Sequence, residues 1–128
     1  MGERGAARIG PATPILRMFD EARARDFYVR WLGFTVVFEH RFAPDLPPYL
    51  GLERDGMALH LSAHHGDTTP GTRVRIAVSD IHALHAELAS RPHAGPPAPA
   101  PTRQPWGEWD MSVIDPFSNR LTFHESMP

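Results

Sequence analysis

A stretch near the C-terminus, residues 104–125, constrains the fold more than any other part of this sequence. Residues 109–113 (WDMSV) alternate apolar and polar side chains, which is typical of a strand with one buried face. Residues 115–119 (DPFSN) follow, and their Asp, Pro and Asn favour a turn. Residues 121–124 (LTFH) alternate again, so the stretch is predicted to form a hairpin of two strands.

Residues 104–107 (QPWG) place a large indole on a stiff loop just before this hairpin. Trp106, beside Gly107, has two interpretations. The indole is either a stacking platform for a ligand or a plug at the end of the core.

The first half of the chain predicts one strand, one helix and three further strands. Residues 1–11 are small, charged and rich in Gly, and we expect a frayed lead-in. Asp20 is a good N-cap for the helix, and Gly33 is placed to end it. Asp55 and Gly56 are a strong hairpin signal between the last two strands. The four strands are predicted at residues 13–19, 34–42, 49–54 and 57–62.

The second half repeats this order after a polar linker at residues 64–72. Residues 73–78 alternate as a strand, and Ser79 or Asp80 caps a helix that closes near Pro92. Residues 91–101 contain too many prolines for a central strand, so we expect an irregular or edge segment there. The C-terminal hairpin supplies the last two strands.

Composition bounds the class of protein. The chain of 128 residues suits a single domain, 1–128. Its net charge of −2 gives no general attraction to nucleic acid. It has no Cys, which excludes disulfides, thiolate nucleophiles and Cys-based zinc sites. No apolar run approaches the length of a membrane span, so we expect no membrane partner and a cytoplasmic location.

The QPWG loop, the DPFSN turn and the repeated order of elements resemble the vicinal-oxygen-chelate superfamily (glyoxalase, bleomycin resistance protein and dioxygenase), most of all its bleomycin-resistance-type members. In those proteins a D-P-x-G-N turn joins the last two strands. Ser118 stands here where Gly is usual, so either the turn forms without an easy positive-φ residue or Asn119 adopts that conformation.

The resemblance implies an α+β fold in which two βαβββ modules form a curved mixed sheet around a groove, with the helices on the outer face. The modules would span about residues 12–63 and 73–125.

Metal-dependent relatives hold a divalent ion at four strand positions. The resemblance places those positions at Thr13, His60, Arg73 and Thr122, and only His60 is a competent ligand. His60 and His124 together supply at most two ligands, fewer than zinc, iron or manganese sites need. We therefore predict no metal and no other cofactor.

Strand alternation within this fold points several side chains into the groove. Aromatic residues, which include Phe38 and Trp109, form the edge of this groove. The arginines there either contact a ligand or pair with Glu108 or Asp110 and only stabilise the sheet. The candidate ligand-binding residues are Trp106, Gly107, His60, Arg73, Arg75, Phe42, Tyr49, Thr122 and His124.

The resemblance favours a small-molecule-binding protein: a homodimer that holds an aromatic ligand in a groove without metal. Groove arginines and a mildly acidic chain argue against bleomycin itself. The alternative is a superfamily enzyme (lyase, isomerase or dioxygenase), which needs a metal or uses His60 or His124 as a general base. A structural or regulatory dimer without a small ligand is the third hypothesis. No catalytic residue is assigned.

Overall fold

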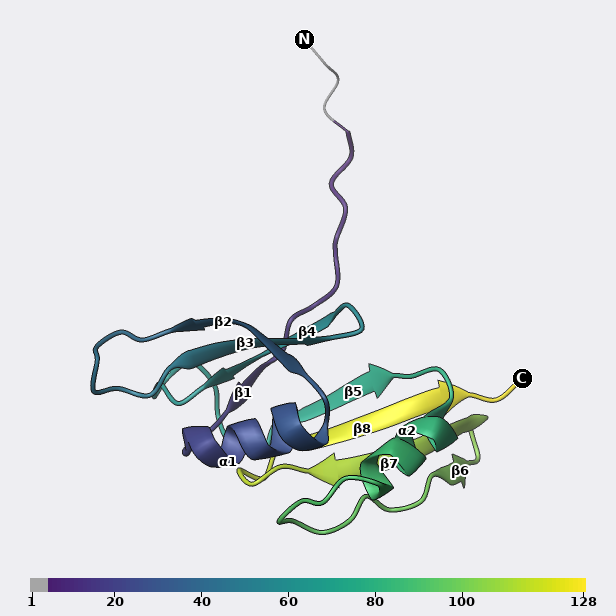
Figure 1. The fold of residues 1–128 in the computed structure, drawn as a ribbon. Coiled ribbons are helices and arrows are strands. Elements are labelled where there is room, and N and C mark those ends of the chain that lie inside the picture. The colour runs from purple at the N-terminus through teal and green to yellow at the C-terminus, as the bar shows by residue number, and fades with distance from the viewer. Residues whose placement is uncertain (1–4) are drawn as a thin grey trace.

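The chain folds into two four-stranded sheets (Figure 1). We describe residues 5–128 from a computed structural model. The first sheet has the strand order β1 (Ile15–Arg17), β4 (Met57–Ser62), β3 (Tyr49–Arg54) and β2 (Thr35–His40). The second has the order β5 (Arg73–Ala77), β8 (Arg120–Ser126), β7 (Glu108–Ile114) and β6 (Thr102–Gln104). In each sheet the first pair, β1/β4 or β5/β8, is parallel and the others are antiparallel.

This order confirms the predicted α+β fold with two βαβββ modules. The same topology occurs twice, and the two sheets stay separate instead of closing into a barrel. Residues 5–14 belong to no strand or helix and lead away from the sheets (Figure 1). Part of the predicted lead-in, residues 1–4, lies outside the described residues.

The helix of the first half has an α-helical part, α1 (Glu21–Arg25), and a π-helical part, η1 (Asp26–Trp31). Asp20 caps it as predicted, because its Oδ1 accepts the Arg23 N–H at 3.0 Å. Gly33 follows the helix with φ +78°, the left-handed conformation that glycine adopts most easily.

The helix of the second half, α2 (Ile81–Ala89), begins at Asp80 and not at Ser79. The Asp80 carboxylate accepts the Ala83 N–H at 3.1 Å, and the Glu125 carboxylate accepts the Asp80 and Ile81 N–H groups at 2.6 and 2.9 Å. Residues 91–101 form no regular element before the edge strand β6, as their prolines predict. Neither helical segment within residues 5–128 is long and apolar enough to cross a membrane.

One hydrophobic core joins the two halves. The apolar face of the first helix is buried in it, with Tyr28 and Trp31 among the largest fully buried side chains. Two hydrogen bonds tie this helix to the second half: Tyr28 donates its hydroxyl proton to Asp115 at 2.6 Å, and Trp31 Nε1–H donates to the Leu88 carbonyl at 3.1 Å. Because the core takes the helix-covered face of each sheet, the other faces are left to solvent or to a partner.

Three predictions need correction. The first strand covers only Ile15–Arg17 of the predicted 13–19, and the second covers only Thr35–His40 of the predicted 34–42. In the DPFSN turn, Ser118 itself takes the positive φ of +70°. Asn119 does not take a positive φ. It is fully buried, and its Nδ2 donates to the Arg17 carbonyl at 2.8 Å and to Asp115 Oδ2 at 2.9 Å.

Candidate ligand-binding surfaces

The candidate residues lie on two different sheets. Within residues 5–128, no hydrogen bond, ion pair or ring contact links the candidates of the first half to those of the second. We name the two groups the aromatic surface (Phe38, Phe42, Tyr49 and His60) and the charged surface (Arg75, Trp106, Glu108, Asp110 and His124). A single chain therefore presents two separate surfaces, one on each sheet.

The aromatic surface is built across β2, β3 and β4. Strand register sets Phe38 beside Gly51 and Gly51 beside His60. The Phe38 ring lies over Gly51 so closely that a Cβ there would sit 2.0 Å from Phe38 Cε2. It meets His60 edge-on at a centroid distance of 5.1 Å and lies nearly parallel to Tyr49 at 6.1 Å. Phe38 still keeps 43% of its surface exposed.

Gly51 was not among the predicted site residues. A glycine inside an otherwise apolar strand signals a close approach by another group, and here that group is the Phe38 ring. Phe38 was expected only as an edge of the groove. The bulge between Val36 and Phe38, which sequence alternation does not reveal, brings its ring over Gly51.

His60 is held by Tyr49 through a contact of 2.8 Å between the tyrosine hydroxyl and Nδ1. Burial, together with the Asp67 carboxylate, raises the pKa of the Tyr49 hydroxyl, so the hydroxyl keeps its proton. The direction of this hydrogen bond is set by the His60 tautomer: Tyr49 donates when Nδ1 is unprotonated and accepts when Nδ1 carries the proton. Phe42 lies further along, 59% exposed, and lines a pocket of about 210 Å³ with Leu46, Tyr49 and His64.

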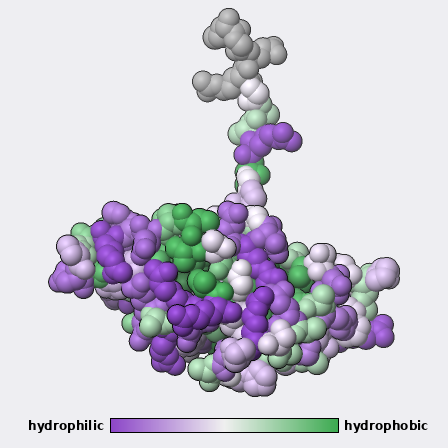
Figure 2. Space-filling view, in the orientation of Figure 1, coloured by the Kyte–Doolittle hydropathy of each residue, from purple (hydrophilic) through white to green (hydrophobic). Residues whose placement is uncertain are grey.

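Figure 2 shows a green, apolar area over the first sheet, surrounded by purple, hydrophilic residues. The exposed apolar residues of this sheet include Ile15, Val37 and Phe38. Apolar groups exposed together beside aromatic rings are typical of a binding surface.

The charged surface is centred on Glu108. Its carboxylate accepts the Trp106 Nε1–H at 2.7 Å, pairs with the Arg75 guanidinium, and lies 3.5 Å from His124 Nδ1. Arg75 also lies 3.8 Å from Asp110 Oδ2. The hydrogen bond from Trp106 and the pairing with Arg75 lower the pKa of Glu108. Burial and the neighbouring Glu108 raise the pKa of Asp110.

Trp106 is 65% exposed, so its indole does not plug the core. The loop that carries it is held at both ends: the Gly107 N–H donates to the Gln104 carbonyl at 3.1 Å, and the Met127 N–H donates to the Gly107 carbonyl at 3.0 Å. Gly107 has φ +89°, a conformation that side-chain-bearing residues rarely adopt. The indole is thus anchored by its N–H, while most of the residue stays open to solvent.

The remaining predicted residues have other surroundings. Thr122 Oγ1 lies 2.8 Å from Ser112 Oγ, across β7 and β8. Arg73 is exposed, and within residues 5–128 its side chain has no hydrogen bond or ion pair. Trp109 was expected at the groove edge, but it packs against the core and meets the His82 ring at a centroid distance of 4.7 Å. It does so because the core face of β7 carries residues 109, 111 and 113.

The residues at the implied metal positions do not fit a divalent metal. Strand register pairs His60 with Ile15 and pairs Thr122 with Arg75, so Thr13 and Arg73 are not their direct neighbours. Of these side chains only the His60 imidazole is a common metal ligand, and one imidazole is fewer than the three or four protein ligands that zinc, iron or manganese sites need. No group of three or more His, Asp or Glu within residues 5–128 is arranged to hold a metal ion.

Repeated βαβββ modules with open sheet faces are the architecture expected from the sequence resemblance, and comparison with known proteins agrees. A family model described as "Glyoxalase superfamily protein" matches residues 2–128. The chain belongs to this superfamily. No curated protein matches the chain.

Solved structures share the fold. A bleomycin-binding protein complexed with bleomycin superposes with a TM-score of 0.71 at 24% identity, covering 92% of this chain and 99% of that one. TnmS3, an antibiotic-binding protein from Streptomyces sp. CB03234, gives 0.70 at 22%, covering 94% and 99%. A superfamily member from Sphaerobacter thermophilus gives 0.70 at 22%, covering 92% and 98%. At these identities the likeness establishes the fold.

Proposed function

We propose that this chain binds a small aromatic molecule, without a metal, in a groove between two copies of the chain. The observation that carries the proposal is the Phe38 ring, which lies flat over Gly51 beside Tyr49 and His60 and remains 43% exposed. A ring placed this way offers a stacking surface to a planar ligand. Structures of the same fold that are described as bleomycin-binding and antibiotic-binding support a small-molecule ligand.

Two copies are proposed because one chain supplies only half-sites. Small-molecule sites bury most of their ligand between facing walls, whereas each surface here is the open face of a separate sheet. If the aromatic surface of one copy faces the charged surface of the other, both walls are present. A twofold arrangement of this kind produces two equivalent grooves. A cytoplasmic location stays part of the proposal.

Binding is proposed in preference to catalysis because the residues at the implied metal positions are poor metal ligands. The enzymatic alternative needs a metal to stabilise developing charge, and the residues at the implied positions do not fit one. His60 is the one imidazole at those positions, and Tyr49 already contacts its Nδ1.

The proposal is tested by titrating the protein with bleomycin A2 and with ethidium, following tryptophan fluorescence and, independently, calorimetry. Phe38→Ala removes the stacking ring, and we expect its affinity for a bound probe to fall about 10-fold, since stacking on one aromatic ring contributes about 1–1.5 kcal/mol. Ile114→Ala removes an exposed apolar side chain at the end of β7, outside both named surfaces, and serves as the control. Failure of both probes to bind, or equal affinity of Phe38→Ala and the parent protein, would contradict the proposal.

A further inference from the structure

The charged surface contains its own counter-ion. Arg75 projects from β5, crosses the neighbouring strand β8, and reaches Glu108 and Asp110 on β7. Its guanidinium bonds Glu108 Oε1, the same oxygen that accepts the Trp106 Nε1–H, and lies 3.8 Å from Asp110 Oδ2. The arginine charge is therefore directed at the two acids of its own sheet.

Burial differs sharply between the partners. The Glu108 and Asp110 side chains are only 13% and 15% exposed, while the Arg75 side chain is 52% exposed. The acids thus form the floor of the surface and the guanidinium covers them. Asp110 Oδ1 is buried and has no hydrogen-bond partner within residues 5–128, so the acids retain an unused acceptor.

In such an ion pair, the exposed side chain is the one that can move away from its partner into solvent. Partly exposed ion pairs contribute little to stability, because water solvates the separated charges well. Loss of the ion pair would cost the two mostly buried acids more free energy than it would cost the exposed arginine, since an uncompensated buried charge is unfavourable. A ligand cation that reaches Glu108 and Asp110 can replace the guanidinium, which then turns to solvent. An anionic ligand would draw Arg75 away and leave the acids uncompensated.

We propose that Arg75 is a built-in counter-ion of the ligand site: it occupies the Glu108–Asp110 pair in the empty protein, and a cationic group of the aromatic ligand displaces it. This inference rests on the proposed function and adds the charge class of the ligand, an aromatic cation. It also changes the role of Arg75 from a ligand contact to a residue that sets specificity by competing with the ligand for the same acids.

The test compares two matched variants, Arg75→Gln and Arg120→Gln. Both remove one positive charge from the second sheet, and Arg120 lies on β8 in the same alternation as Thr122 and His124. Within residues 5–128 the Arg120 side chain makes no ion pair with Glu108 or Asp110. Ethidium serves as the aromatic cation and 8-anilinonaphthalene-1-sulfonate as the aromatic anion, each titrated by calorimetry at low and at moderate salt.

Removing the competitor should tighten ethidium binding about 3- to 5-fold in Arg75→Gln, while Arg120→Gln changes it by less than about 2-fold. Both variants should weaken binding of the anionic probe, and Arg75→Gln more than Arg120→Gln, because Arg75 is the arginine that neutralises Glu108 and Asp110. Equal effects of the two variants on ethidium would reduce Arg75 to a long-range charge and overturn the inference. Weaker ethidium binding by Arg75→Gln would overturn it as well.

The inference and the proposed function fail in different ways. If the parent protein binds ethidium and Phe38→Ala binds it more weakly, but Arg75→Gln behaves like Arg120→Gln, only the counter-ion role is wrong. If neither the parent protein nor Arg75→Gln binds any probe, the proposed function is wrong and the inference falls with it. Circular dichroism and thermal unfolding of each variant show whether a loss of binding reflects a loss of folding.

Discussion

At the scale of single residues, Asp115 has the largest structural role in the closing turn. It is 4% exposed, and its Oδ1 accepts the N–H groups of Phe117 and Asn119, each at 2.8 Å. Its Oδ2 accepts the Tyr28 hydroxyl proton at 2.6 Å, and burial with this acid raises the pKa of Tyr28 well above its usual value. One carboxylate thus shapes the turn and attaches it to the first helix.

The same turn gives a residue-scale prediction. Ser118 has φ +70°, which strains a residue with a side chain but not glycine. We expect Ser118→Gly to raise the free energy of unfolding by about 0.5–1 kcal/mol, measured by urea unfolding. Ser79→Gly is the control, since Ser79 has no positive φ and its replacement should give no gain. A loss of stability in Ser118→Gly would show that the side chain contributes more than the backbone strain removes.

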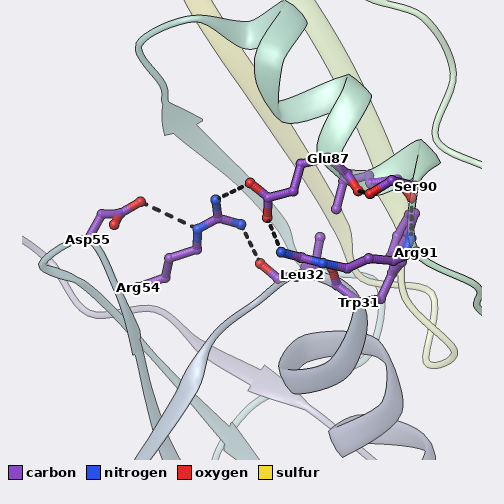
Figure 3. Close-up of polar contacts among 8 residues, drawn as sticks. Trp31, Leu32, Arg54, Asp55, Glu87, Ser90 and Arg91 are labelled. Atoms are coloured by element: carbon purple, nitrogen blue, oxygen red, sulfur yellow. Dashed lines mark hydrogen bonds and ion pairs between the residues drawn. The ribbon is translucent and has the colours of Figure 1, made fainter.

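At the scale of elements, a seam of charged groups joins β3, η1 and α2 (Figure 3). Arg54 from β3 donates to the Leu32 carbonyl at 2.6 Å and to Glu87 of α2 at 2.8 Å. Arg91, just after α2, donates to the Trp31 carbonyl at 2.7 Å and lies 2.7 Å from Glu87. Two guanidinium groups from different halves therefore satisfy carbonyls at the end of the first helix, and Glu87 joins them.

The seam predicts a pH effect. Burial of Glu87 opposes ionisation, but the hydrogen bonds and charges of Arg54 and Arg91 outweigh it and lower the pKa of Glu87. A carboxylate with a lowered pKa in the folded chain stabilises it above its unfolded pKa, and this stabilisation is lost as pH falls through the folded pKa. We expect Glu87→Gln to cost about 1–2 kcal/mol at pH 7 and less near pH 3, measured by urea unfolding at both values.

Glu53→Gln is the control for the seam. Glu53 is an exposed carboxylate on the same strand as Arg54, and within residues 5–128 it makes no ion pair. Its replacement should change stability little at either pH. An equal loss for Glu87→Gln at pH 7 and pH 3 would mean that Glu87 contributes through packing instead of charge.

At the scale of the whole molecule, the arrangement of the two surfaces is the feature that matters for function. The halves share one core on the helix-covered faces of their sheets, so the aromatic and charged surfaces belong to different open faces. The residues of each surface contact one another. No contact within residues 5–128 joins the aromatic surface to the charged surface. A second copy is the simplest source of the missing wall.

This predicts a dimer in solution. Size-exclusion chromatography with light scattering should give about twice the chain mass of 14.3 kDa. Dilution should produce monomers with a parallel loss of probe binding, because the proposed groove lies between two copies of the chain. A species of 14.3 kDa that binds the probes with undiminished affinity would contradict the two-copy groove.

The sequence by itself determined the order of the elements, the helix caps and the repeat, because these depend on local periodicity and turn chemistry. The sequence also indicated Glu108 and Asp110 as partners for the groove arginines, whereas Trp109, expected at the groove edge, packs against the core. Only the tertiary structure decided which residues meet: the Phe38 ring over Gly51, Arg75 on Glu108, and Tyr28 on Asp115. Periodicity tells which way a side chain points, but its neighbours depend on register, bulges and packing between segments far apart in the chain.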